Sequence, residues 1–258
     1  IFDDDNMYTN KKRAKALFRR MIERNIAMPW TSPATAVFRL DNEVIDLMAQ
    51  SGCSYINIAI EAGSERVTRD IVLKPLDYEH AKKMVAYAKK KGIFVGANFI
   101  IGFPTETWDE IRETIRVAEN LDVDYAKIFI ALPLRNTELF DLAKETDSLL
   151  MDPADAKTMW TVGGVIKSKH WSADDLTILR AYEWDRINFS DPKKLKKTAN
   201  RMGITTDELN VIRRRTMDYA KKIISDRKSV HPDSSVKKAA DITLVSSDKS
   251  SSSLEKKH

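Results

Sequence analysis

Five short polar segments in the first 140 residues carry side chains that could bind a ligand. They lie at residues 3–6, at Arg39, and at residues 61–64, 102–107 and 133–137. Each one follows or ends an apolar run, and together they combine carboxylates, an arginine and glycines. Carboxylates bind ammonium groups, arginine binds carboxylates, and glycine lets a ligand approach the backbone closely. This combination suits a zwitterionic ligand that carries a sugar.

The elements that must position these side chains follow from apolar periodicity. Runs at residues 1–3, 35–40, 55–61, 93–101 and 125–132 are typical of strands, and the segments between them have the spacing of amphipathic helices. Asp41 and Asp77 are placed to cap helices, and Thr107 and Glu110 have the spacing of a capping box. The alternation predicts an α/β fold with a parallel sheet, in which ligands gather at the carboxyl ends of the strands.

Three parts of the chain differ in pattern. Residues 1–148 hold the alternation of strands and helices, and residues 149–228 show helix patterns alone, with starts at Ser172 and Thr205. Residues 229–258 are rich in Ser, Lys and Asp, so we expect a disordered tail. The sequence begins with Ile1 inside an expected strand, and we therefore expect it to be part of a longer protein.

Charge and cysteine content restrict the class of protein. Residues 191–228 hold 12 basic and 5 acidic residues (12 − 5 = +7), whereas residues 1–190 hold 26 and 29 (26 − 29 = −3). The slightly acidic main body offers no nucleic-acid footprint. The sequence has no membrane-length apolar stretch and no signal-peptide pattern, and its only cysteine is Cys53. These features favour a cytoplasmic protein that is not bound to a membrane.

A family resemblance rests on four segments, which read IFDDDNMYTNKKRA, FRLDNEVIDLMAQSGCSYINIAIEAGSERV, VGANFIIGFPTETWDEI and ALPLRNTELFDLA. In order and spacing they resemble the radical S-adenosylmethionine (SAM) enzymes. The similarity is greatest to the branch that is often fused to a cobalamin-binding domain, which includes anaerobic cyclases and methyltransferases. It covers about residues 1–145.

The resemblance implies an incomplete (β/α) barrel of about five parallel strands, followed by a helical C-terminal extension. It also implies SAM, a 4Fe-4S cluster, a small-molecule substrate, an electron donor such as a flavodoxin or ferredoxin, and in some members cobalamin. The cluster motif C-x-x-x-C-x-x-C is absent, so we expect it upstream of Ile1. Without it the chain alone should be inert. Its missing first strand should leave a sheet edge that permits an edge-to-edge dimer.

The resemblance assigns cofactor-binding positions but no catalytic residue. The positions are Asp4, Asp5, Arg39, Glu61, Ser64, Asn98, Ile100, Gly102, Glu106 and Pro133. The two aspartates would face the SAM amino group, Glu61 and Ser64 the ribose, and the stretch from Asn98 to Glu106 the adenine. Arg39 would reach the SAM carboxylate or the substrate. From the residues alone, Arg39 could instead form a structural ion pair, and Glu61 and Glu106 could cap helices.

Nucleic-acid binding is the rival function, and it depends on the basic segment at residues 193–222. This segment has helix-turn-helix spacing, with Gly203 at the turn and Arg213, Arg214 and Arg215 in the second helix. Base-reading residues usually lie early in that helix, whereas these arginines lie late in it. The segment is therefore better explained as part of the helical extension.

Overall fold

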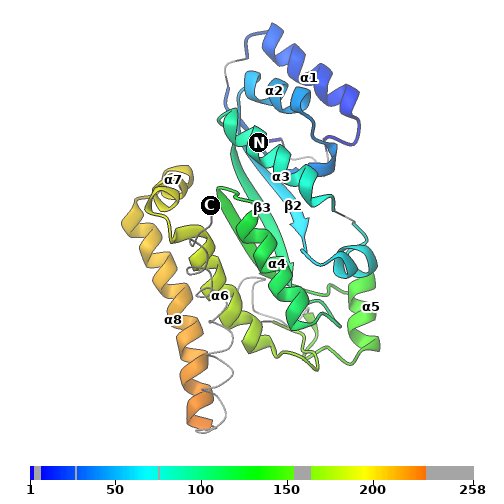
Figure 1. Cartoon of the computed structure of the whole chain (residues 1–258), viewed down its shortest axis with the longest axis vertical. Coiled ribbons are helices and arrows are strands. Elements are labelled where there is room, and N and C mark those ends of the chain that lie inside the picture. The colour runs from blue at the N-terminus through cyan, green and yellow to red at the C-terminus, as the bar shows by residue number, and fades with distance from the viewer. Residues whose placement is uncertain (3–6, 27, 75, 154–163, 231–258) are drawn as a thin grey trace, which may run out of the picture.

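The computed structural model describes residues 1–2, 7–26, 28–74, 76–153 and 164–230, with side chains described up to residue 227. Its centre is one parallel sheet of four strands, in the spatial order β1-β2-β3-β4. Figure 1 shows β2 and β3 side by side. The strands are β1 (Trp30–Thr35), β2 (Cys53–Glu61), β3 (Phe94–Ile101) and β4 (Tyr125–Ile130). Since all four strands run in the same direction, their carboxyl ends lie together at one end of the sheet, which we call the carboxyl edge.

Eight α-helices accompany the sheet in these residues. They are α1 (Lys11–Glu23), α2 (Asn42–Gln50), α3 (Tyr78–Lys90), α4 (Trp108–Asn120), α5 (Glu138–Glu145), α6 (Ala173–Phe189), α7 (Pro192–Met202) and α8 (Thr206–Val230). The expected caps are confirmed: Asp41 and Asp77 accept the Val44 and His80 backbone N–H groups, and Thr107 forms a complete capping box with Glu110. The sequence therefore fixes where these helices begin.

The two faces of the sheet have different surroundings. On one face, Ile58, Ala97 and Ile128 are buried, and α2, α3 and α4 pack on that side. On the other face the central positions are more accessible: Ala59 is exposed and Asn98 is half-buried, although both lie in interior strands. Because side chains alternate along a strand, this difference separates a packed outer face from an open inner face.

Helix α6 covers the outer edge of β4 and satisfies its backbone. The Asn188 amide accepts the Ala126 N–H at 2.8 Å and donates to the Ala126 carbonyl at 2.8 Å. Arg180 Nε donates to the Ile128 carbonyl at 3.1 Å. An edge strand would otherwise present unpaired donors and acceptors. The helical region thus completes the sheet at this end.

One strand lies elsewhere than the sequence predicts, and one is only partly described. The run at residues 35–40 was expected to be a strand, but β1 ends at Thr35 and Val37–Arg39 form a 3-10 helix. Pro33 argues against a strand because it has no N–H, yet β1 accommodates it through a register shift between Ser32 and Thr35. The described part of the expected first strand places the Phe2 N–H 3.0 Å from the Thr31 carbonyl, beside β1.

The helices after the sheet are joined to it and to one another by ion pairs. Lys197 of α7 lies 2.5 Å from Asp124, just before β4, and Arg213 of α8 lies 2.7 Å from Asp185 of α6. No helix within the described ranges is both long enough and apolar enough to cross a membrane. The tail predicted at residues 229–258 lies outside the described residues, apart from the end of α8.

Candidate functional site

The parallel sheet brings most of the predicted site residues to its carboxyl edge. Arg39 follows β1, Glu61 ends β2, Gly102 follows β3 and Pro133 follows β4. Asp4 and Asp5 lie outside the described residues. Ligands bind at this edge in parallel α/β folds, because loops there can converge on one point.

Glu61 lies at the end of β2 with a strained backbone. Its φ is 67°, in the left-handed region, and the β2–β3 register shifts between Ala59 and Glu61. The carboxylate is 15% exposed and its nearest cation is Lys74 at 3.4 Å. It does not cap a helix. A non-glycine residue in this region costs on the order of 1 kcal/mol or more, and such strain is often kept at ligand sites.

The segment after Glu61 is held against α4. The Gly63 N–H donates to Thr114 Oγ1 at 2.9 Å, and a Cβ at Gly63 would lie 2.7 Å from the Glu113 carbonyl oxygen. Glycine is therefore required by the approach of the helix backbone. Ser64 is buried, and its hydroxyl lies 3.4 Å from Glu110 Oε1.

An arginine–glutamate pair connects the same two segments. Arg66 Nε and Nη2 donate to the two Glu110 carboxylate oxygens at 2.6 and 2.8 Å. Donation from Arg66 lowers the pKa of Glu110 to about 2. Because bidentate pairs fix direction as well as distance, this pair orients the loop that carries Glu61 and Ser64.

Glu106 shapes the loop after β3 from within the protein. Its side chain is fully buried, and Oε2 accepts the N–H groups of Gly102 and Phe103 at 2.5 and 2.9 Å. Burial raises the pKa of Glu106 to about 8, although these two amides oppose the shift. Gly102 has φ 83°, and a Cβ there would lie 2.2 Å from Leu176. Glu106 thus holds a turn that glycine alone can adopt without a clash.

The inner face of the sheet adds a residue that the sequence analysis missed. Register pairs Asn98 with Ala59 on one side and with Lys127 of β4 on the other, so the three form a row across the sheet. Ile100 lies on the same face, nearer the carboxyl edge. Lys127 stands within an otherwise apolar strand, and that isolated charge was the available signal.

Arg39 and Pro133 lie at opposite ends of the site. Arg39 is exposed in the 3-10 helix, with its guanidinium 5.2 Å from the Phe38 ring centroid, and has no ion pair within the described part of the chain. The structural ion pair that was considered for Arg39 is therefore not seen. Pro133 is buried, three residues beyond the end of β4.

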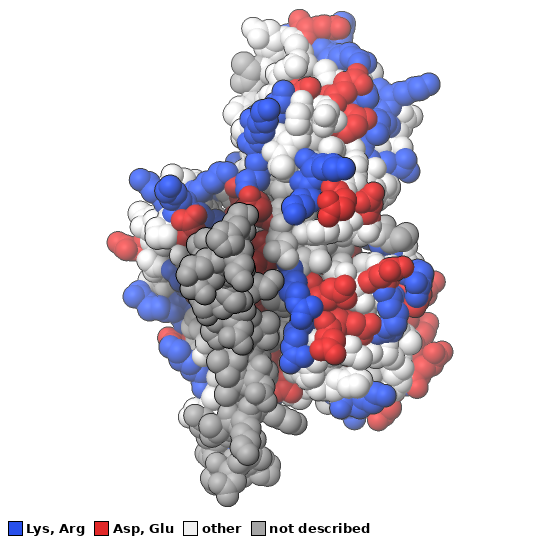
Figure 2. All heavy atoms as spheres, in the orientation of Figure 1, with Lys and Arg blue, Asp and Glu red and all other residues white. Residues whose placement is uncertain are grey.

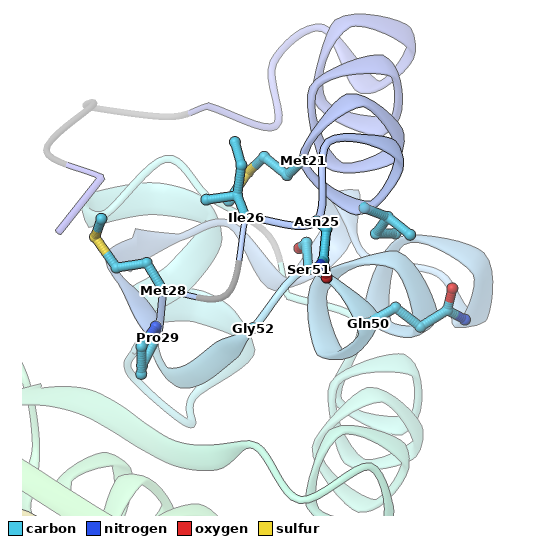
Figure 3. Close-up of a pocket in the computed structure, with 9 residues that line it drawn as sticks. Met21, Asn25, Ile26, Met28, Pro29, Gln50, Ser51 and Gly52 are labelled. Atoms are coloured by element: carbon cyan, nitrogen blue, oxygen red, sulfur yellow. The ribbon is translucent and has the colours of Figure 1, made fainter.

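A separate pocket lies at the other end of the sheet, where the amino ends of β1 and β2 lie. It occupies about 370 Å³ between the end of α1, the segment before β1 and the turn after α2. Figure 3 shows Met21, Met28 and Gly52 around it. Since it adjoins the amino ends of β1 and β2, it contains none of the predicted site residues.

Cys53 does not form a cluster site. It is 7% exposed at the start of β2, at the edge away from Glu61, and burial raises its pKa to about 12. No group of three or more His, Cys, Asp or Glu side chains that could hold a metal occurs among the residues the structure describes. With one cysteine in the sequence, this chain cannot provide the three thiolates of a SAM-cleaving cluster.

Comparison with known proteins agrees with this arrangement of strands and loops. Residues 4–118 match the Radical SAM superfamily. Those residues belong to the radical SAM superfamily. They include α1 to α4, β1 to β3 and the loops at the carboxyl ends of these strands.

Two relatives of this chain are methyltransferases by name. Cytidylyl-2-hydroxyethylphosphonate methyltransferase of Streptomyces wedmorensis is 36% identical over 143 residues, covering 53% of this chain and 26% of the relative. An uncharacterized methyltransferase of Pyrococcus horikoshii is 32% identical over 178 residues, covering 69% and 38%. The chain thus spans well under half the length of these curated relatives.

A solved structure supports the radical SAM fold. TsrM, a radical SAM methyltransferase from Kitasatospora setae determined with cobalamin and a 4Fe-4S cluster, aligns with a TM-score of 0.50 and 19% identity. The alignment covers 60% of this chain and 31% of TsrM. The α/β fold with parallel strands and C-terminal helices is therefore that of a partial radical SAM barrel.

The basic segment forms a helical hairpin, as its spacing predicts. Gly203 ends α7 with φ 70°, and α8 follows it. Two of its cations are used internally, since Lys197 pairs with Asp124 and Arg213 with Asp185. Figure 2 shows basic and acidic side chains interleaved over the visible face. The internal pairings leave fewer cations of this segment free to contact phosphates.

Proposed function

We propose that this chain supplies the SAM-binding and substrate-facing part of a radical SAM methyltransferase. The observation that carries the proposal is the superfamily match over the residues that build the carboxyl edge, together with the names of the two relatives. Related members also include an anaerobic magnesium-protoporphyrin IX monomethyl ester cyclase, which is 25% identical over 142 residues. Methyl transfer is preferred because the two relatives compared above, 36% and 32% identical to this chain, are methyltransferases by name.

The proposed SAM contacts divide by chemistry. Glu61 would accept hydrogen bonds from the ribose hydroxyls, because its carboxylate has only one distant cation, Lys74. Asn98 and Ile100 would contact adenine from the inner face, and Asp4 and Asp5 would pair with the amino group. Arg39 has no acidic partner in the described residues and would bind the carboxylate of SAM.

Other predicted residues would hold the loops around SAM in place instead of contacting SAM directly. Glu106 and Ser64 are buried and bonded to neighbouring segments, so in this proposal they shape the loops around SAM. Gly102 allows the turn after β3, and Pro133, buried after β4, would form the last contact of the site.

The remaining components would come from outside this chain. In the full-length protein a cysteine motif would bind the 4Fe-4S cluster, which with SAM supplies radical chemistry, and a flavodoxin or ferredoxin would deliver electrons. Cobalamin would be a further cofactor, as in the solved TsrM structure. The residues described above would bind and orient SAM and the small-molecule substrate.

The test is product analysis with the full-length protein, SAM and a low-potential reductant. A methyltransferase leaves S-adenosylhomocysteine once the methyl group has been transferred, whereas a mutase or cyclase that uses SAM only as a radical source does not. S-adenosylhomocysteine formed in step with turnover supports the proposal. Turnover that yields 5′-deoxyadenosine and methionine but no S-adenosylhomocysteine contradicts methyl transfer and leaves the radical assignment in place.

A further inference from the structure

Lys127 is a cation without an acidic partner on the inner face of the sheet. It lies at the middle of β4, between Tyr125 and Phe129 on the same face, and is half-buried. Burial lowers the pKa of Lys127, and no opposing charge contributes to the shift. It has no hydrogen bond or ion pair with any residue that the structure describes. A half-buried ammonium group in this state is costly, because desolvation is not offset by a counter-charge.

The carboxylates on neighbouring elements contact other groups than Lys127. Asp124 pairs with Lys197 at 2.5 Å and accepts the Val95 N–H at 2.9 Å. Glu61 faces Lys74 at 3.4 Å. The Glu106 carboxylate is buried in the loop after β3. None of these groups neutralises Lys127.

A second cation near β4, Arg180, also has no carboxylate partner among the described residues. Arg180, on the helix that covers β4, is 9% exposed and donates to the carbonyl of Ile128, the residue after Lys127. Its guanidinium lies 5.6 Å from the Trp184 ring centroid and makes no ion pair within the described ranges. Lys127 and Arg180, one in β4 and one beside it, thus both lack a carboxylate partner among the described residues.

A polar atom without a partner lies beside Lys127. Asn98 pairs with Lys127 in the β3–β4 register, and its Oδ1 atom is buried with no hydrogen-bond partner among the described residues. On the other side of Asn98, Ala59 provides a small, exposed side chain. A buried amide oxygen and an uncompensated ammonium group in one row indicate a place where a polar ligand completes the bonding.

We propose that Lys127, with Asn98 beside it, binds an anionic group of the substrate, a carboxylate or a phosphoryl group, on the inner face of the sheet. This rests on the proposed function, since it places the substrate in the barrel next to SAM. Lys127 then acts as a binding residue that selects acidic substrates. Its ammonium group would donate to the anion. Asn98, which also borders the proposed adenine position, would use Oδ1 to accept from a hydroxyl or amine of the same substrate.

The test uses the whole 258-residue chain, labelled with ¹⁵N, and two probes, methylphosphonate and acetate. Saturable shifts at Asn98 and the β4 amides are expected with at least one probe, and the stronger probe identifies the anion class. Lys127→Met should weaken that binding by roughly tenfold or more, the scale of a lost charged hydrogen bond. Lys127→Arg should retain most of it. Lys83→Met, at an exposed lysine on α3, is the matched control and should change nothing.

Thermal unfolding distinguishes a binding role from a structural one. Lys127→Met should leave the melting temperature unchanged or raise it, because an unpaired cation is removed from a half-buried position. A clear drop would show that the lysine supports the fold. Absence of saturable shifts in the original chain, or equal anion affinity in Lys127→Met, would overturn the proposal.

The last measurement is the binding of S-adenosylhomocysteine to both proteins. Its affinity should be the same in Lys127→Met as in the original chain. If the substitution weakens it, Lys127 serves the amino-acid carboxylate of SAM and the substrate assignment is wrong. If S-adenosylhomocysteine binds neither protein while the anion still binds at Lys127, the anion site holds and the proposed function fails.

Discussion

Glu106 shows how one buried carboxyl group that holds a loop can make the stability of the protein depend on pH. Its Oε2 accepts two backbone N–H groups, while Oε1 is buried without a partner. The pKa raised to about 8 means that the folded protein keeps a proton at neutral pH that the unfolded chain, with a pKa of 4.5, releases. The stabilising effect of this proton is complete below the unfolded pKa and disappears as pH rises through the folded one.

Glu106→Gln should remove that pH dependence. The amide keeps a carbonyl acceptor for Gly102 and Phe103 and carries no ionisable proton. Between about pH 5 and about pH 8, the free energy of unfolding of the unmodified chain should fall relative to the variant by about 1–4 kcal/mol. Urea unfolding at several pH values measures this difference. A constant difference across that interval would show that Glu106 is ionised in the folded protein.

The packing of α4 against the loop after β2 explains why glycine occupies position 63. The backbone of α4 approaches so closely that a Cβ would lie 2.7 Å from the Glu113 carbonyl oxygen and 2.8 Å from Thr114 Cα. The Arg66–Glu110 pair holds the same contact. The IEAGSE segment is thus shaped by α4, 46 residues away along the chain at the contact of Ser64 with Glu110.

Gly63→Ala should destabilise the protein by about 1–3 kcal/mol, the usual cost of overpacking a closed contact. It should also displace the loop that carries Glu61. Thermal unfolding checks the first effect. Glu65→Ala is the control in the same loop, because its side chain is 91% exposed. A melting temperature in Gly63→Ala equal to that of the control would show that the helix moves away without cost.

Sequence patterns predict some elements well and others poorly, for physical reasons. Local signals suffice for helix starts, since a capping side chain binds a backbone group only two or three residues away. The strand at β1 was misplaced because Pro33 argues against a strand locally, whereas pairing with β2 decides the outcome. Likewise, the need for glycine at position 63 depends on a contact with α4 that sequence spacing does not reveal.

The site was predictable to the extent that parallel strands place their ends together. Glu61, Gly102 and Pro133 follow from that rule alone. Their individual roles do not, because whether a side chain faces the ligand or its own loop is decided by burial. Ser64 and Glu106 are buried and bonded within the protein, whereas Arg39 is exposed. Edge-to-edge dimerisation beside β1 stays a prediction.

At the scale of the whole molecule, the chain has a partial barrel but lacks the cluster ligands. Sheet, outer helices and α6 form continuous cores, and α6 completes the β4 edge. The sole cysteine is buried at the edge away from the proposed SAM site. SAM binding and cluster binding would therefore depend on different segments of the full-length protein.

Anaerobic reconstitution with iron and sulfide should leave this chain without a cluster. One buried thiol with a pKa raised to about 12 cannot replace three exposed thiolates. Bound iron should stay far below four atoms per chain, and Cys53→Ser should behave identically. Iron analysis and visible absorption measure this. Stoichiometric loading with four irons would mean that other side chains of this chain ligate the cluster.

The proposed function requires the carboxyl edge of the sheet to be the SAM site. Its most direct test is titration of the ¹⁵N-labelled chain with S-adenosylhomocysteine, followed by amide shifts. Without a cluster the dissociation constant should be roughly millimolar. Shifts should concentrate at Gly63, Asn98 and Gly102, and Glu61→Ala should weaken binding by about tenfold or more while Glu65→Ala does not. Shifts confined to Met28 and Gly52 at the opposite pocket, or no saturable shift, would contradict the account.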